Sequence, residues 1–369
     1  MQKKVMIYDA ADSPALPIAR SLGRRGVEIR LASSKERASA FHSKFSSKNY
    51  LVRNYREALE VAVDEGCELF IPLLSEKELV EVAKMKSNEI KIACGDYEAV
   101  ETLIDKRKIT EIAQDIGIPV PETFFPKTEE DIFEFAKSGE FILKLRVGSG
   151  GRGVYRIKNL EEYFSLKRNL KFNEEDVLLQ KAVKGKQLSV SALSDASGFI
   201  VAFVYERLRF HPHPFGPATY LKSSRDDECL LYSEKLARKI KYSGIVNFDF
   251  IVDEVDNKPK LIDVNPRFWG SVNAAAVCGI DFPWLLYQFY LGSVDEFAEE
   301  YVEGIHLRSV VDDLKSVVSI LSSKDESIRS KAKALLDFLN FFKYKEFMLD
   351  FSDPLPNLYE ILGILRRRI

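Results

Sequence analysis

Apolar and polar positions alternate in short blocks along the first 95 residues. Val5–Tyr8, Val27–Ala32, Leu69–Leu73 and Ile90–Cys94 are short apolar runs typical of buried strands. Longer stretches with helical spacing separate these runs, and Ser75 is placed to cap one of them. Strands that alternate with helices predict a small parallel sheet covered by helices on both faces.

The pattern changes after residue 100. Two predicted strands, Phe141–Arg146 and Val154–Ile157, flank a glycine-rich loop. Two further pairs of strands follow, namely Leu188–Ser194 with Phe199–Glu206 and Ile245–Val252 with Pro259–Val264. Residues 305–369 are predicted to be mainly helical. We therefore expect a chain of mixed α/β and α+β class that ends in a helical extension.

Composition narrows the classes of function. The 369 residues carry 54 Lys and Arg against 56 Asp and Glu, a net charge of −2, which argues against a nucleic-acid partner. No run approaches the roughly 20 apolar residues of a membrane span. Cys67, Cys94, Cys229 and Cys278 lack the spacing of a zinc module or a disulfide framework. We expect a cytoplasmic protein with no membrane partner, and formation of a homo-oligomer stays open.

The strongest chemical signal is a pair of acidic strands around a turn at Asp256. A hairpin centred on this residue places Asp249 directly opposite Asp263. Two carboxylates about 4 Å apart repel by roughly 4 kcal/mol at an effective dielectric constant near 20, so a semi-buried pair requires a cation. With the amide oxygen of Asn265 they form a hard oxygen set suited to Mg²⁺. Arg267, on the same face, offers a planar group for phosphate or carboxylate.

Strict alternation along the second strand assigns the faces. Leu261 is expected beside Asp263 on the polar face, and Ile262 with Val264 on the apolar face. The pairing fails if the loop contains an even number of residues, because one strand would then turn its other face. The competing interpretation is a solvent-exposed strand face, on which acids are common.

The loop Gly148–Gly153 reads Gly-Ser-Gly-Gly-Arg-Gly. A dinucleotide-binding fingerprint would require a helix directly after it, whereas Val154–Ile157 is predicted to be a strand. A glycine loop between two strands indicates a flap whose backbone N–H groups close over phosphates. Lys144 and Arg152 add positive charge to that flap. An ordinary glycine-rich turn is the alternative.

Three segments together resemble the ATP-grasp superfamily, in particular carbamoyl-phosphate-synthase-like carboxylate–amine ligases. They are FILKLRVGSGGRGV, LLQKAVKGKQLSV, and GIVNFDF with LIDVNPRFWGS, in that order. The resemblance implies an ATP-grasp fold in four parts: an N-terminal α/β domain at 1–100, a small lobe with the glycine flap at 101–183, a large lobe with the metal site at 184–304, and a helical extension at 305–369.

The resemblance also assigns roles to individual positions. Nucleotide contacts fall on Lys106 and Lys144 for phosphates, on Gly148, Ser149, Gly150, Gly151, Arg152 and Gly153 as the flap, on Gln180, Lys181, Ala182 and Val183 as the hinge beside adenine, and on Gln187 for the ribose. Asp249, Asp263 and Asn265 match the metal ligands, Arg267 matches the arginine beside the transferring phosphoryl group, and Arg207 and Arg209 fall near the acyl phosphate.

The activity that the resemblance implies is ATP-dependent and ADP-forming. A small-molecule carboxylate is activated as an acyl phosphate and passed to an amine or another nucleophile, with ATP and Mg²⁺, or Mn²⁺, as cofactors. The sequence departs from the family at four positions, with Lys181 in place of a common acid, Gln187 in place of glutamate, and Asp249 and Asp263 where glutamate is more frequent. An ATP-grasp carboxylase, a kinase-like phosphotransferase and a non-catalytic nucleotide-binding protein stay open as alternatives.

Overall fold

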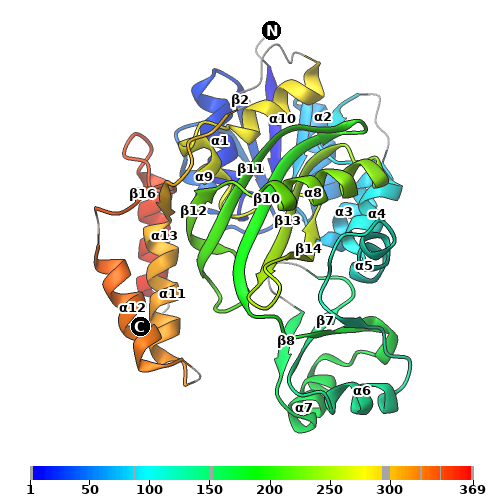
Figure 1. Cartoon of the computed structure of the whole chain (residues 1–369). Coiled ribbons are helices and arrows are strands. Elements are labelled where there is room, and N and C mark those ends of the chain that lie inside the picture. The colour runs from blue at the N-terminus through cyan, green and yellow to red at the C-terminus, as the bar shows by residue number, and fades with distance from the viewer. Residues whose placement is uncertain are drawn as a thin grey trace.

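A computed structural model describes residues 3–85, 89–148, 153–292, 300–324, 326–340 and 342–366. Three sheets organise these residues, and Figure 1 shows the largest of them between the other two. No helix in the described ranges combines the length and the apolar character that crossing a bilayer requires.

The N-terminal sheet is parallel throughout, as the alternating pattern predicts. Its strands, in spatial order, are β3 (Ser46–Leu51), β2 (Glu28–Ser33), β1 (Lys4–Tyr8), β4 (Leu69–Pro72) and β5 (Lys91–Ile92). The accompanying helices are α1 (Ala15–Arg24), the 3-10 helix η1 (Ser39–His42), α2 (Tyr55–Asp64), α3 (Glu76–Ala83) and α4 (Tyr97–Ile104). Apolar residues on both faces of β1 are buried, so helices cover the sheet on two sides.

The small sheet is antiparallel and lies below the large sheet in Figure 1. Its order is β6 (Thr123–Phe124), β9 (Val177–Lys181), β7 (Phe141–Leu145) and β8 (Val154–Ile157). Helix α5 (Lys106–Asp115) precedes it, and α6 (Glu129–Ala136), α7 (Leu160–Leu170) and the 3-10 helix η2 (Glu174–Asp176) belong with it. Ile132 of α6 and Tyr163 of α7 pack on Phe141 and Leu143 of β7 to form a separate small core.

The large sheet has seven strands. Their order is β14 (Pro259–Asn265), β13 (Gly244–Asp253), β10 (Gly185–Asp195), β11 (Gly198–Phe210), β12 (Ala218–Ser224), β15 (His306–Arg308) and β16 (Lys345–Glu346). Its helices are α8 (Asp227–Ile240), α9 (Val272–Val277) and α10 (Phe282–Leu291). One face, with Val190 and Phe248, shares a core with the N-terminal sheet through Met6 and Phe70. The two sheets are therefore joined through a continuous apolar interior.

The C-terminal extension is less purely helical than the sequence predicts. Strands β15 and β16 extend the large sheet, and the helices are α11 (Val310–Ser322), α12 (Ile328–Leu339) and α13 (Leu355–Arg366). These two strands have only three and two residues, too short for a hydrophobic pattern to identify.

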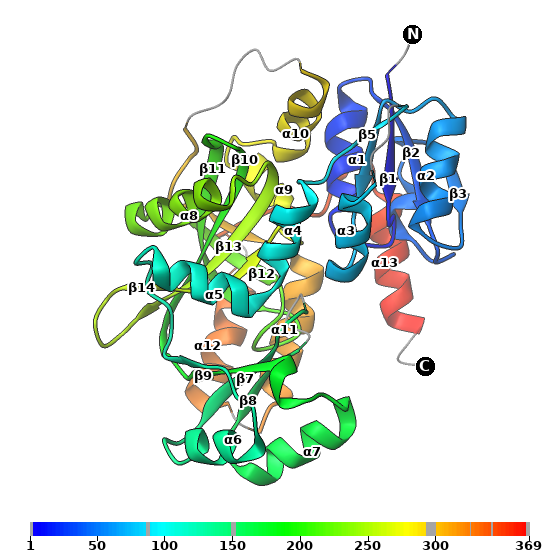
Figure 2. The ribbon, with the colours of Figure 1, turned by 90° about the vertical axis from the view of Figure 1, so that its right-hand side faces the viewer.

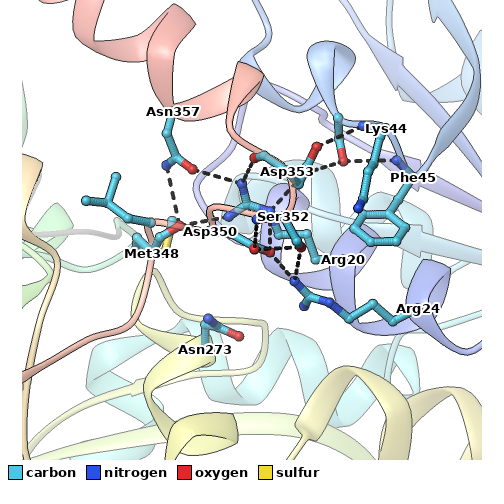
Figure 3. Close-up of polar contacts among 12 residues, drawn as sticks. Arg20, Arg24, Lys44, Phe45, Asn273, Met348, Asp350, Ser352, Asp353 and Asn357 are labelled. Atoms are coloured by element: carbon cyan, nitrogen blue, oxygen red, sulfur yellow. Dashed lines mark hydrogen bonds and ion pairs between the residues drawn. The ribbon is translucent and has the colours of Figure 1, made fainter.

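The last part of the chain returns to the N-terminal sheet, and Figure 2 shows α13 beside it. Figure 3 shows the contact, in which the carboxylate of Asp353 accepts hydrogen bonds from Arg20 Nε at 2.9 Å and Ser43 Oγ at 2.8 Å. The other guanidinium nitrogens of Arg20 donate to the carbonyl of Met348 at 2.7 Å and to the side chain of Asn357 at 2.8 Å. This buried network fastens the C-terminus to α1.

Candidate active site

A cavity of about 240 Å³ lies between the small sheet and the large sheet. Strands β7, β8 and β9 line one side, and β10, β11, β13 and β14 line the other. Most of the residues expected to act together surround this one space, namely Lys106, Lys144, Gln180, Lys181, Val183, Gln187, Arg207, Asp249, Asp263, Asn265 and Arg267. The sequence segments that carry the resemblance therefore converge in three dimensions.

The two aspartates face each other, and this prediction is confirmed. Asp249 of β13 is the register partner of Asp263 of β14. Nearer the turn, however, Phe250 pairs with Leu261, and continuing that register would set Asp249 opposite Ile262. One extra residue, a β-bulge at Ile262, moves Asp263 into place.

The bulge also corrects the predicted faces of β14. Leu261 is 3% exposed and packs with Val264 in the core, whereas Ile262 lines the cavity beside Asp263. The prediction that Ile262 shares the apolar face and Leu261 the polar face is therefore wrong. Strict alternation cannot hold across a bulge, because the inserted residue reverses the face of every residue beyond it.

Asp249 is held in position by its neighbours. Its Oδ1 accepts hydrogen bonds from Ser189 Oγ at 2.6 Å and from Asn247 Nδ2 at 3.0 Å. Its Oδ2 lies 3.3 Å from Nη1 of Arg207, which also donates from Nη2 to the Gly216 carbonyl at 2.7 Å. These partners fix the carboxylate toward the cavity.

Asp263 has a different environment. Its Oδ1 is buried and lies 3.1 Å from Lys106 Nζ, without the alignment of a hydrogen bond, and Oδ2 accepts from Asn265 Nδ2 at 3.3 Å. Burial alone would raise the pKa of the Asp263 carboxyl, but the ammonium groups of Lys106 and Lys144 outweigh it and lower the pKa below its usual value. The neighbouring lysines therefore favour the charged carboxylate form of Asp263.

These residues fit a hard divalent cation. The opposed carboxylates of Asp249 and Asp263 and the amide oxygen of Asn265 supply oxygen donors of the kind that Mg²⁺ accepts. Nowhere in the described ranges do three or more His, Cys, Asp or Glu side chains gather in a way that could hold a metal ion. The protein donor set is thus small, as in sites where substrate phosphates and water complete the octahedron.

Lys144 projects from β7 toward β14. Its Nζ donates a hydrogen bond of 2.7 Å to the carbonyl of Ile262, the bulged residue. Burial lowers the pKa of Lys144 to about 8, against the opposing effect of Asp263. Lys106, at the first position of α5, donates to the Gly148 carbonyl at 2.7 Å. Both ammonium groups therefore stand beside Asp263.

Arg267 links the cavity to the N-terminal sheet. Its Nε lies 3.3 Å from Oε1 of Glu76, which begins α3 after β4. Nη1 donates to the Phe268 carbonyl at 3.0 Å, and Nη2 to Asn265 Oδ1 at 3.3 Å. Since Glu76 is 8% exposed, the guanidinium is held by a buried carboxylate.

The flap is described only at its ends. Ser149, Gly150, Gly151 and Arg152 lie outside the described residues. Gly148 contributes its carbonyl to Lys106. Gly153 has φ +89°, and a Cβ there would lie 3.1 Å from the Leu145 side chain, so both conformation and space favour glycine.

The segment predicted as the hinge borders the cavity. Gln180 is buried and donates from Nε2 to Thr123 Oγ1 at 3.0 Å, while the backbone N–H of Lys181 donates to the Glu122 carbonyl at 2.9 Å. Gln180, Lys181, Val183 and Gln187 all line the cavity. Ala182, between them, does not line it.

Arg207 and Arg209 occupy opposite faces of β11. Arg207 lines the cavity, but a bulge between the two arginines turns Arg209 away. Arg209 instead donates to both carboxylate oxygens of the buried Asp313 on α11, at 2.8 and 2.6 Å. The expected role of Arg209 beside an acyl phosphate is not supported by this geometry, because its guanidinium is enclosed under the C-terminal helices.

Some supporting residues were not predicted. Ser189 on β10 donates a hydrogen bond to Asp249, and Tyr205 on β11 donates one to Asn247. The segment Phe215–Ala218 also lines the cavity. A signal for Ser189 exists in the sequence, because Ser189 and Ser191 alternate with Leu188, Val190 and Ala192. The segment Phe215–Ala218 has no comparable pattern.

Comparison with known proteins gives a consistent result. Residues 103–271 match the ATP-grasp domain family. Carbamoyl-phosphate synthase of Methanobrevibacter smithii is 25% identical over 241 residues, which cover 60% of this chain and 63% of that protein. The carbamoyl phosphate synthase large chain of Clostridium acetobutylicum is 25% identical over 195 residues, which cover 50% of this chain and 18% of that protein. The chain therefore spans less than two thirds of these relatives.

Solved structures share the fold. N5-carboxyaminoimidazole synthetase from Staphylococcus aureus, complexed with ADP, aligns with a TM-score of 0.65 and 17% identity over 83% of this chain and 80% of that one. The biotin carboxylase domain of Hydrogenobacter thermophilus 2-oxoglutarate carboxylase, in complex with MgADP and bicarbonate, aligns with a TM-score of 0.65 and 20% identity. The alignment covers 83% of this chain and 73% of that one. The predicted resemblance and fold class are confirmed.

Proposed function

The chain carries an ATP-grasp domain, and we propose that it is an ADP-forming ligase that activates a small-molecule carboxylate as an acyl phosphate and transfers it to an amine or another nucleophile. The observation that carries this proposal is the position of Asp263. Its carboxylate stands opposite Asp249, with the buried Oδ1 3.1 Å from Lys106 Nζ, in the cavity that Lys144 also lines.

The nucleotide would lie between the two sheets. Gln180, Lys181 and Val183 would border adenine, and Gln187 the ribose, because they line the cavity and match these positions in the resemblance to ATP-grasp enzymes. The phosphates would extend toward Lys106 and Lys144, where two positive charges compensate theirs. Asp249, Asp263 and Asn265 would hold Mg²⁺, which neutralises phosphate oxygens when bound.

The first chemical step forms the acyl phosphate. A carboxylate oxygen of the substrate attacks the γ-phosphorus of ATP, the bond from that phosphorus to the bridging oxygen breaks, and ADP leaves. Arg267 would steady the transferring group, since its guanidinium is oriented by Glu76 and Asn265. Arg207, held by Asp249 and Gly216, would orient the substrate carboxylate.

The second step transfers the acyl group. The amine nitrogen attacks the carbonyl carbon, the carbon–oxygen bond to phosphate breaks, and inorganic phosphate leaves as the amine loses a proton. The flap 148–153 would exclude water that otherwise hydrolyses the acyl phosphate. No side-chain nucleophile takes part, which agrees with a site built from cations and metal-binding oxygens.

The experiment is a substrate screen with the purified chain. Pools of carboxylates and amines are incubated with ATP and Mg²⁺, ADP is followed by a coupled assay, and new products are found by mass spectrometry. We expect ADP release that requires a carboxylate, together with a product of the joined mass. ADP release that requires bicarbonate alone would favour a carboxylase, and formation of AMP would contradict the acyl-phosphate route.

A further inference from the structure

Exposed apolar side chains concentrate in the C-terminal helices. Most of the large exposed hydrophobic residues in the described ranges lie between Leu314 and Leu362. Helix α12 and Phe342 beyond it carry several of them, with Ile328 87% exposed, Leu336 69% exposed and Phe342 fully exposed. Contiguous apolar surface of this kind marks an interaction site on a folded protein.

The apolar residues of α12 form one stripe. Ile328, Leu335 and Leu339 follow spacings of seven and four, so they lie on the same side of the helix, and Leu336 adjoins them. The opposite side faces the protein, because Ala334 is buried and the carbonyls of residues 337 and 338 accept hydrogen bonds from Arg308. Figure 1 shows α12 on the outer side of α11, away from the large sheet.

Basic residues border this stripe. Arg329 and Lys333 lie on one flank and Lys331 on the other, at helical positions adjacent to the apolar residues. Asp337 is the sole acid in the sequence 327–343, and it points toward the protein, 3.8 Å from Arg209 Nη1. The surface therefore combines an exposed apolar centre with a positive rim.

We propose that α12 docks this protein onto an anionic lipid bilayer. A helix with an apolar face and Lys and Arg along its borders lies in the plane of the membrane interface, where apolar side chains enter the acyl boundary and basic groups meet acidic headgroups. This docking is peripheral and agrees with the lack of a spanning helix in the described ranges. It revises the sequence-based expectation that the chain has no membrane partner.

The charge pattern favours lipid over a second copy of the chain. A symmetric pair formed through this stripe would bring Arg329, Lys331 and Lys333 of each copy close to the same residues of the other. Like charges in such positions repel.

The test is flotation of the full chain with vesicles. One set contains phosphatidylcholine alone, and the other contains equal parts of phosphatidylcholine and phosphatidylglycerol. We expect binding to the anionic set and little to the neutral one, with binding reduced as salt is raised. Binding to neither set, or equally to both, would overturn the proposal.

Substitutions in α12 test whether this helix is the surface that binds vesicles. Leu335→Ser with Leu336→Ser should weaken vesicle binding about tenfold or more, and Lys333→Gln about fivefold. Leu231→Ser is the matched control, because Leu231 is 60% exposed on α8, away from the stripe. Thermal melting verifies that each variant folds. Equal binding by the stripe and control variants would contradict the assignment, as would concentration-dependent dimer formation that the stripe variant abolishes.

Discussion

The ammonium group of Lys144 donates a 2.7 Å hydrogen bond to the carbonyl of Ile262. Lys144 belongs to the small sheet, and Ile262 is the bulged residue of the large sheet. The bulge therefore has two consequences, because it moves Asp263 opposite Asp249 and presents a carbonyl to the lysine. A single inserted residue connects the proposed metal-binding oxygens with the lysine that we propose binds phosphate.

The depressed pKa of Lys144 predicts a pH dependence of nucleotide use. Since burial lowers this pKa to about 8, the free enzyme loses the ammonium charge as pH rises through 8. The charged form attracts phosphates, so kcat/KM for ATP should fall above about pH 8 with a slope approaching one decade per pH unit. Steady-state kinetics across this range measure the effect.

The control for this profile is a lysine outside the cavity. Lys144→Arg keeps its charge at all these pH values and should remove the decline, whereas Lys186→Met on β10 should leave it unchanged. A decline that persists in Lys144→Arg would assign the titration to another group.

Removal of one carboxylate charge should stop the reaction. Asp263→Asn retains the shape of the side chain but loses a metal-binding oxygen and the charge that faces Lys106 and Lys144. We expect substrate-dependent ADP release to fall at least about 100-fold, as measured by the coupled assay. Asp256→Asn, in the exposed turn of the same hairpin, should retain full activity. Equal activity of the two variants would refute the metal assignment.

The hydroxyl of Ser189 should tune metal affinity. It supplies one of two hydrogen bonds to Oδ1 of Asp249, so Ser189→Ala loosens a metal-binding carboxylate. The Mg²⁺ concentration for half-maximal activity should rise about tenfold, with kcat at saturating Mg²⁺ largely retained. Ser194→Ala is the control, because Ser194 is equally buried on β10 but bonds only to nearby backbone carbonyls. The same shift in both variants would indicate a general effect on the strand.

The buried ion cluster of Asp313, Arg209 and Arg308 under the C-terminal helices should contribute strongly to the free energy of unfolding. Asp313 is fully buried between Arg209 and Arg308, so Asp313→Ala leaves two buried guanidinium groups without their shared carboxylate. The free energy of unfolding, measured with urea, should fall by about 3–5 kcal/mol. Glu134→Ala breaks an exposed pair with Lys137 and should leave this free energy nearly unchanged. A small effect of Asp313→Ala on this free energy would show that the ion cluster does not stabilise the fold.

A hairpin centred on Asp256 predicts the opposition of Asp249 and Asp263, but the pairs nearer the turn, such as Val252 with Pro259, are shifted by one residue from that centre, so the opposition arises from the β-bulge at Ile262. The sequence does not predict this bulge, because one inserted residue produces no recognisable pattern of hydrophobic positions. The same limit explains Arg209, which a second bulge turns to the far face of β11. Strand β3 was missed for another reason, because its residues are largely exposed at a sheet edge and lack an apolar alternation.

The sequence also does not predict which residues far apart in the chain contact each other. Glu76 meets Arg267 across 191 residues of sequence, and Arg20 meets Asp353 across 333. Such contacts depend on how the sheets share their cores, which local patterns do not encode.

The most direct measurement uses the carboxylate that the screen identifies, with both of its oxygens replaced by ¹⁸O. An acyl-phosphate route transfers one carboxylate oxygen to phosphorus, because the later bond cleavage occurs between that oxygen and carbon. We predict that the inorganic phosphate released with ADP contains one ¹⁸O atom, as determined by mass spectrometry. Phosphate without ¹⁸O would contradict the activation of the carboxylate by ATP at this site.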